Sequence, residues 1–150
     1  MRCFSRALAL TPEGHPDLSG RHASLGVSYT HRYRRTGDPD ALDQAMRCFS
    51  RALTLTQEGH PDLPRRRFSL AVSCRNQFQL TQYSFHLEAT LRSFRSASQL
   101  STGAPRDVFN FAFRWAKLAS EHTYLKPLEA FRPTIDLLPH HIWLGATTAQ

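Results

Sequence analysis

Histidine and cysteine are the side chains with the most obvious chemical use in this sequence, and their spacing argues against that use. The 150 residues include 8 His and 3 Cys. His140 and His141 are adjacent, and adjacent residues on a helix point about 100° apart, so their imidazoles do not converge on one ion. Neither Cys-x-x-Cys nor His-Glu-x-x-His occurs. We therefore expect no metal site and no cofactor.

Other catalytic arrangements are also missing from the sequence. The 7 glycines form no phosphate-binding loop, and the 12 acidic residues form no close pair within an apolar stretch. Cys3, Cys48 and Cys74 are odd in number and follow no secretion signal, which is typical of reduced thiols. Cys3 and Cys48 are equivalent in a repeat described below, which favours small buried residues. We expect no catalytic residues and no enzymatic activity.

The phrase Glu-Gly-His-Pro-Asp-Leu occurs twice, at residues 13–18 and 58–63. Gly, Pro and Asp form turns, so the phrase predicts a stiff loop, with Asp62 capping the next helix and Pro64 opening it. A ligand-binding His-Asp pair is the alternative interpretation.

Arginine dominates the basic residues of the chain. Of 19 basic residues only Lys117 and Lys126 are lysines, and the net charge is +7. Two basic clusters have aromatic residues beside them: Arg32, Arg34, Arg35, Arg65, Arg66, Arg67, with Tyr29, Tyr33 and Phe68. Basic groups interleaved with aromatic rings are one way to hold RNA. A solvated helix surface is the simpler interpretation, and at a helix C-terminus such charges are favourable.

An internal repeat defines the elements that carry these residues. Residues 1–18 and 46–63 agree at 16 of 18 positions, at an offset of 45. A fainter third copy pairs Phe49 with Phe94. Each copy predicts two helices, and the second shows a 3.6-residue apolar period at Leu42, Ala45, Met46, Phe49, Ala52 and Leu53.

Capping residues give the expected limits of that second helix. The sequence Gly37-Asp38-Pro39 begins it, with Asp38 as N-cap and Pro39 at the first helical position. We expect Gly59 to end it. Further along, residues 108–119 are apolar on most sides and predict a buried helix. Pro133 lies in the helix after that and removes a hydrogen bond at a cost of about 3 kcal/mol, so we expect that helix to be kinked or split.

The unit resembles a tetratricopeptide repeat. Leu25-Gly26 and Tyr29 match the first helix of that family, and Ala45, Phe49 and Ala52 match its second. The family unit has about 34 residues, whereas this one has 45. Seven of the extra residues precede Ala45, and seven is close to two helical turns, so we expect a longer first helix with an unrotated packing face. The small residues let neighbouring helices approach while Phe49 fills the gap.

At a finer level the chain resembles the repeat arrays of fungal proteins that carry a C-terminal CHAT domain, a caspase-like protease domain. The resemblance rests on the repeated loop phrase, the 45-residue unit and an end segment with Arg114-Trp115-Ala116, Ile135-Asp136-Leu137-Leu138-Pro139 and Trp143-Leu144-Gly145. The His and Cys of the protease have no counterpart in this sequence, so the resemblance implies no activity for it.

We predict an all-α chain of tandem helical hairpins that form an α-α superhelix, a tetratricopeptide-like solenoid. Its units are a half repeat at 1–18 (second helix and loop), repeats at 19–63 and 64–104, a degenerate last repeat at 105–145 and a tail at 146–150. Met1 is equivalent to Met46 within a second helix, and no polar capping helix closes the other end. We therefore expect a truncated gene copy or an incomplete gene model.

The resemblance places a ligand groove on the first helices. The implied groove residues are Ala23, Val27, Thr30 and His31 in one unit and Arg65, Phe68, Val72, Arg75 and Asn76 in the next. Arg65, Phe68 and Arg75 share one helix face by their spacing. Arg34 and Arg35, at the other end of the preceding helix, are expected to matter much less. Such a mixed apolar and basic groove suits an acidic or amphipathic peptide.

The expected function is protein–protein interaction, as a scaffold or sensor arm of a larger fungal CHAT-type protein. The alternatives are an RNA-binding helical solenoid and a non-functional truncated remnant. No apolar run approaches the ~20 residues of a membrane helix and no signal peptide is present, so we expect a cytoplasmic protein without membrane partners. Self-association through uncapped ends is also expected.

Overall fold

The chain folds into helices alone in the part that the structure describes. This computed structural model describes residues 2–99, 104–122 and 127–146, so most of the predicted tail at 146–150 lies outside it. The helices are α1 (Arg2–Ala9), α2 (Leu18–Thr36), α3 (Pro39–Thr54), α4 (Leu63–Thr81), α5 (Ser84–Ser98), α6 (Pro105–Glu121) and α7 (Pro127–Ala146). The predicted all-α class is confirmed, and the tetratricopeptide-type superhelix stays a prediction. None of the described helices is both long and apolar enough to cross a membrane.

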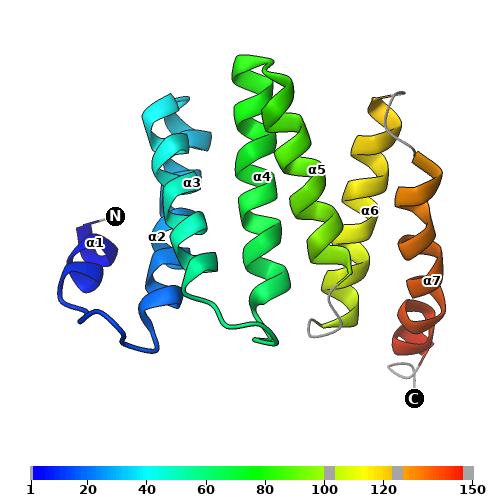
Figure 1. Cartoon of the computed structure of the whole chain (residues 1–150), viewed down its shortest axis with the longest axis horizontal. Helices are drawn as coiled ribbons and strands as arrows, with labels where there is room; N and C mark the ends of the chain where they lie inside the picture. The colour runs from blue at the N-terminus through cyan, green and yellow to red at the C-terminus, as the bar shows by residue number, and fades with distance from the viewer. Residues whose placement is uncertain (1, 100–103, 123–126, 147–150) are drawn as a thin grey trace.

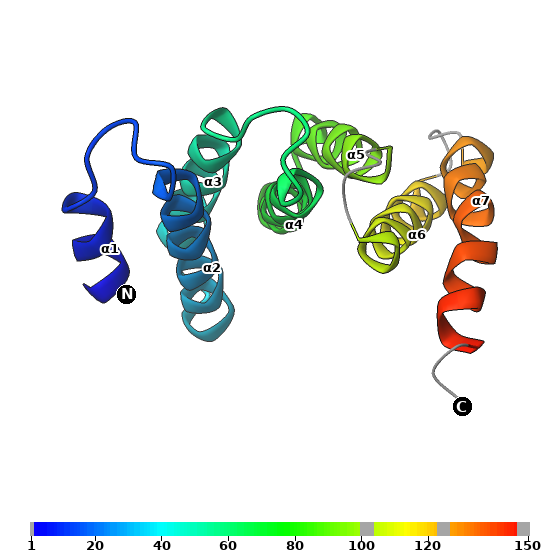
Figure 2. The same ribbon diagram turned by 90° about the horizontal axis from the view of Figure 1, so that it is seen from below.

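The helices stand side by side in chain order (Figure 1). The most extensive contacts join α2 to α3, α4 to α5 and α6 to α7, and smaller ones join α3 to α4 and α5 to α6. In addition α2 touches α4 and α4 touches α6. Figure 2 shows α2, α4 and α6 along one side of the row, with α3 and α5 along the other. The first helices α2 and α4 have 19 residues each, against 16 and 15 in α3 and α5.

The predicted start of α3 is confirmed, and its predicted end is wrong. Asp38 caps α3 by accepting a hydrogen bond from the Asp40 backbone N–H at 3.1 Å, with Pro39 as the first residue. Gly37 belongs to the end of α2, where its left-handed backbone (φ 68°) donates to the Tyr33 carbonyl at 2.7 Å. Gly59 (φ 83°) lies in the loop, because α3 already ends at Thr54.

The close approach of α2 and α3 depends on Gly26. A Cβ at this position would lie 2.8 Å from the Phe49 ring, which is buried between the two helices. Ala45 and Ala52 on α3 are fully buried. The predicted packing role of these small residues is confirmed.

A cluster of buried residues connects the helices of the C-terminal half. It joins α4 and α5 to α6 and α7 and contains Ala71, Leu87, Phe94, Trp115, Ala116, Leu118, Ala119 and Ala130. The prediction of a buried helix at 108–119 is confirmed for most of its apolar residues, while Phe109 is partly buried, Phe113 is half exposed, and the polar residues Asn110, Arg114 and Lys117 are exposed. The prediction of a split at Pro133 is wrong, since α7 continues through it. Ala130 and Thr134 are buried on either side of the proline, so packing holds both halves in place.

Candidate partner groove

Three adjoining depressions run across α2, α4 and α6, and together we call them the α2–α4–α6 groove. The first lies between α2 and the start of α4, and it shares Val27, Phe49 and Ser69 with the second. The second shares Arg34, Val72 and Arg114 with the third, which lies between α4 and α6. The three are therefore continuous along the side of the row that α2, α4 and α6 form.

All nine predicted groove residues line these depressions. Ala23 and Arg65 line the first, Thr30, His31 and Phe68 the second, Arg75 and Asn76 the third, while Val27 and Val72 each line two.

Two of the nine are occupied by contacts within the fold. Thr30 is buried and its hydroxyl donates to the Gly26 carbonyl at 3.0 Å. Phe68 stacks on Phe111 at 4.4 Å between ring centroids, and the Arg114 guanidinium lies 5.3 Å from its centroid. These two residues shape the groove more than they offer atoms to a ligand.

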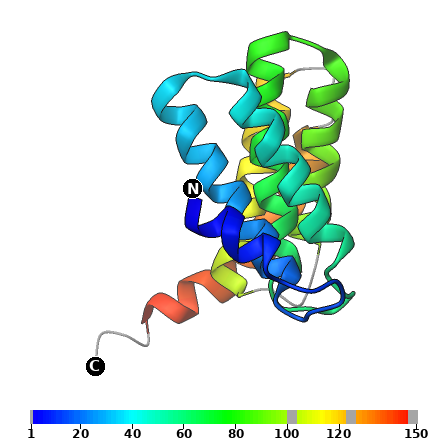
Figure 3. The ribbon, with the colours of Figure 1, turned by 90° about the vertical axis from the view of Figure 1, so that its left-hand side faces the viewer.

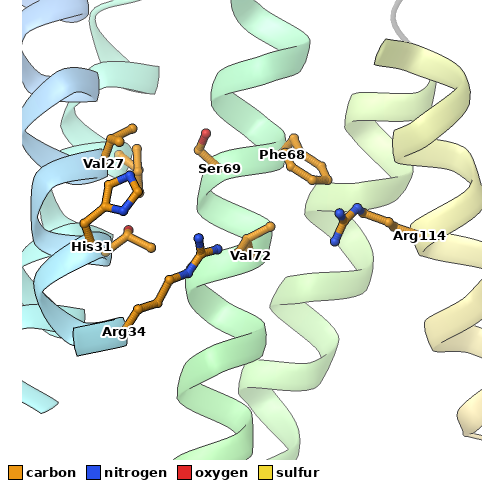
Figure 4. A pocket seen from close by; sticks show the side chains of 9 residues that line it. Val27, His31, Arg34, Phe68, Ser69, Val72 and Arg114 are labelled. Carbon is orange, nitrogen blue, oxygen red and sulfur yellow. The ribbon is translucent and has the colours of Figure 1, made fainter. Parts of the chain in front are cut away.

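The sequence interpretation missed the contribution of α6 and misplaced Arg34. Arg114 and Lys117 on α6 line the groove, as does Arg34 at the end of α2. Arg34 was expected to lie away from it, but α2 is long enough to bring its last turn opposite Val72 (Figure 4). The pattern at 108–119, in the degenerate last repeat, is too irregular to indicate which residues of α6 face the groove.

The groove combines an apolar floor with unpaired positive charge. Val27 is 44% exposed and Phe113 50% exposed, and Val72 lies half-buried between them. Figure 4 shows His31 and Arg34 reaching from α2 towards α4, and Arg114 reaching from α6. Among the described residues no carboxylate lies within ion-pair distance of the groove cations Arg34, Arg65, Arg75, Arg114 and Lys117. The groove lining also holds two acidic residues, Asp62, which is paired with Arg66, and Glu121, so positive charge is in excess. A cleft with an excess of one sign of charge attracts the opposite charge.

Three members of the two basic clusters have carboxylate partners, and one of them, Arg66, lines the first depression together with its partner Asp62. Arg32 pairs with Asp38 at 2.7 Å. Arg67 reaches Glu58 at 3.4 Å. Arg66 is 7% exposed, pairs with Asp62 at 3.5 Å and also donates to the Thr56 hydroxyl. The clusters are therefore not continuous free basic patches.

The repeated loop phrase folds the same way in both copies. The backbone N–H of Asp17 donates to His15 Nδ1 at 3.1 Å, and that of Asp62 donates to His60 Nδ1 at the same distance. Neither aspartate caps a helix with its side chain, contrary to the prediction for Asp62. The aspartates instead face arginines one turn later, because Asp17 lies 4.0 Å from Arg21 and Asp62 pairs with Arg66. This geometry supports the structural interpretation of the loop.

Cys48 is buried, as predicted, whereas the same prediction is wrong for Cys3, which is exposed because no helix precedes α1 to cover it among the described residues. The two buried thiols, Cys48 and Cys74, have no electrostatic activation. Burial raises the pKa of the Cys48 thiol, and burial raises that of Cys74 to about 11. A thiolate is the reactive form, so both side chains are kept in the unreactive state. Within the described ranges no group of three or more His, Cys, Asp or Glu residues is placed to hold a metal ion.

Comparison of the chain with protein-family models, with curated proteins and with solved structures finds no match.

Proposed function

We propose that this chain is a protein-binding scaffold or sensor arm whose α2–α4–α6 groove takes an acidic or amphipathic peptide segment. The observation that carries the proposal is the set of five unpaired cations around an apolar floor. Acidic side chains of a partner would meet the cations, and its apolar side chains would cover Val27 and Val72. Removing that apolar surface from water contributes roughly 25 cal/mol per Å².

The proposal includes a tetratricopeptide-like solenoid. Two features support it: paired helices that contact each other most, and first helices that also touch across pairs from α2 to α4 to α6. In such arrays each repeat contacts mainly its neighbours, and the stacked repeats form extended concave binding surfaces. A place in a larger fungal CHAT-type protein belongs to the same proposal and rests on the sequence resemblance. A cytoplasmic location belongs to it as well and rests on the pattern of apolar residues in the sequence.

RNA is the less favoured ligand of this surface. Single-stranded RNA is held by aromatic rings on which bases stack. The ring of Phe68 is already stacked on Phe111 and has Arg114 beside it. The basic residues Arg32, Arg66 and Arg67 are paired within the chain.

Charge reversal within the groove tests the proposal. The probe is a fluorescein-labelled peptide of repeating Glu-Glu-Leu-Leu units, followed by fluorescence anisotropy. We expect Arg65→Glu with Arg75→Glu to weaken binding by at least about tenfold, since the loss of even one charge-assisted contact worth about 1.4 kcal/mol is a factor of ten. Circular dichroism should show unchanged helicity.

The matched control reverses two arginines outside the groove. Arg47 and Arg92 are exposed, occupy equivalent positions on α3 and α5, and line none of the three depressions. Arg47→Glu with Arg92→Glu should leave peptide binding nearly unchanged. If both double variants lose the same affinity for the peptide, and binding weakens as the salt concentration rises, the attraction is a diffuse charge effect. Retention of a labelled single-stranded RNA under the same conditions would then favour the RNA alternative, and no binding of either probe would favour the remnant.

A further inference from the structure

The third depression of the groove, between α4 and α6, has a composition of its own. It is a cavity of about 470 Å³, and its lining includes Arg34, Arg75, Arg114 and Lys117. These four cations come from three different helices. Two side-chain amides, Asn76 and Asn110, face the same space. Glu121 is the one acidic residue among its lining residues, all of which lie in the described part of the chain.

This charge cluster does not follow from the repeat. At the 45-residue offset, the position of Arg34 is occupied by Gln79, and that of Arg75 by Thr30. The packing residues Phe49 and Phe94, by contrast, do recur. The repeat therefore explains the framework of the groove, and the convergence of cations at this one place is a separate property of the chain.

The cavity offers more hydrogen-bond donors than the two oxygens of one carboxylate can accept. Each guanidinium carries five N–H donors in a rigid fork that suits bidentate contact with phosphate, and Lys117 adds a point charge. A phosphate monoester offers about −1.5 to −2 charge and three acceptor oxygens, against one charge and two oxygens for Glu or Asp. Taken together, three arginines, a lysine and two amides fit a dianionic phosphate better than a carboxylate.

We infer that this cavity binds a phosphorylated side chain within the partner peptide, so that phosphorylation of the partner controls its capture. The inference rests on the proposed function and adds the chemistry of the partner. The ligand is a peptide and not a free phosphate compound, because the cavity opens through Val72 into the apolar second depression. A phosphoserine in the cavity would therefore place an adjacent residue over the exposed apolar surface near Val27.

The Arg114 side chain is positioned for such a contact by an aromatic ring of the fold. Its guanidinium lies 5.3 Å from the centroid of the Phe68 ring, and that ring is fixed by Phe111 and by Phe94 at 5.6 Å. An arginine positioned by a ring loses less side-chain freedom when it binds an anion. We expect Arg114 and Arg34, which line the cavity from opposite helices, to hold the phosphate between them.

Degenerate labelled peptides with one fixed central residue test the inference. Three probes carry phosphoserine, glutamate or serine at the centre, and anisotropy is measured at physiological ionic strength with the full chain. We expect the phosphoserine probe to bind about tenfold or more tightly than the glutamate probe, because of its greater charge and extra acceptor. In Arg34→Gln with Lys117→Gln both acidic probes should bind more weakly, and the phosphoserine probe should lose more, so that its preference over the glutamate probe shrinks to about twofold or less. Arg47→Gln with Arg92→Gln is the control and should keep the preference.

The outcomes separate this inference from the proposed function. Equal binding of the phosphoserine and glutamate probes overturns the inference and leaves the acidic-peptide groove standing. Absence of binding by all three probes overturns both. A preference that survives in Arg34→Gln with Lys117→Gln overturns the assignment to this cavity. Free O-phosphoserine that competes as well as the unlabelled phosphopeptide would identify a small-anion site and overturn the peptide assignment. Thermal melts of each variant confirm that the fold is retained.

Discussion

At the scale of single residues, the contact between Gly26 and the Phe49 ring is the tightest constraint in the N-terminal half of the chain. A methyl group at Gly26 would lie 2.8 Å from that buried ring. At the equivalent place in the next unit the chain has Ala71, which is fully buried opposite Phe94. The two helix pairs thus pack a phenylalanine against different residues at the equivalent position. Gly26 leaves no room for a side chain, whereas the next pair accommodates Ala71.

We predict that Gly26→Ala destabilises the protein. Overpacking a core costs about 1–3 kcal/mol, and the gain in helix propensity from glycine to alanine returns up to about 1 kcal/mol. The expected net loss in the free energy of unfolding is therefore about 1 kcal/mol, measured by urea denaturation. Gly20→Ala is the control on the same helix, since nothing lies within 4 Å of a Cβ there, and it should stabilise slightly. Gains in both variants would contradict the packing role.

The residues of the groove show what the sequence reveals at this scale. The positions that the family resemblance implies on α2 and α4 were enough to select residues that line it, from Ala23 to Asn76. It did not reveal that Phe68 is covered by Phe111, because that contact depends on how far α6 approaches α4. The contribution of Arg114 was missed for the same reason, because it also depends on how α6 packs against α4. Contacts between helices that share no repeat pattern can be identified only from the three-dimensional structure.

At the scale of helices and turns, the two inter-helix turns at Gly37 and Gln82 are equivalent in position and unequal in strain. Gly37 ends α2 in the left-handed region with φ 68°, and Gln82 ends α4 with φ 57°. Each donates its N–H to a carbonyl four residues earlier, Tyr33 and Phe78 respectively. Glycine adopts this conformation without a Cβ penalty, and glutamine does not.

We predict that Gln82→Gly stabilises the chain by about 1 kcal/mol, because the left-handed conformation costs an L-residue about 1–2 kcal/mol and the greater freedom of unfolded glycine offsets part of the gain. Differential scanning calorimetry measures the change. The reciprocal variant, Gly37→Gln, should lose a comparable amount. A lower melting temperature for Gln82→Gly would mean that its side chain stabilises the turn by more than the backbone strain costs.

Helix ends and interruptions were predictable where a local residue decides them. Asp38 and Pro39 set the start of α3 through their own backbone and side-chain chemistry. Gly59 did not set its end, since the Thr56 hydroxyl accepts from Arg66 and donates to the Ala52 carbonyl at 2.5 Å, which closes the last turn without a glycine. The path of α7 through Pro133 likewise depends on burial of Ala130 and Thr134 against other helices.

At the scale of the whole molecule, α7 leaves apolar side chains uncovered. Leu128 is 86% exposed and Ile135 59% exposed, and Leu138 is also exposed. Figure 3, seen from the N-terminal end of the row, shows the last part of α7 (red) extending beyond the other helices. A face of this kind is a place for association.

We predict concentration-dependent association of the isolated chain through this face. Sedimentation velocity across a concentration series should show a rising average mass, and Leu128→Lys with Ile135→Lys should lower it. The matched control is Glu88→Lys with Glu121→Lys, which changes exposed acidic residues on α5 and α6. A compact monomer at every concentration would contradict the prediction.

The near identity of residues 2–9 and 47–54 gives the chain two copies of one packing surface, and only one of them is matched to Gly26 in the folded molecule. Helices α1 and α3 both adjoin α2, one before it and one after it. During folding, the surface of α2 around Gly26 can meet either of two nearly identical segments, residues 2–9 or residues 47–54. These segments are joined to α2 by loops of different length. The loop at 37–38 is far shorter than that at 10–17, so closing it costs less chain entropy. Loop length therefore favours the copy in α3, as do Ala41, Leu42 and Ala45, which precede the copied segment in α3, are buried and have no counterpart in α1.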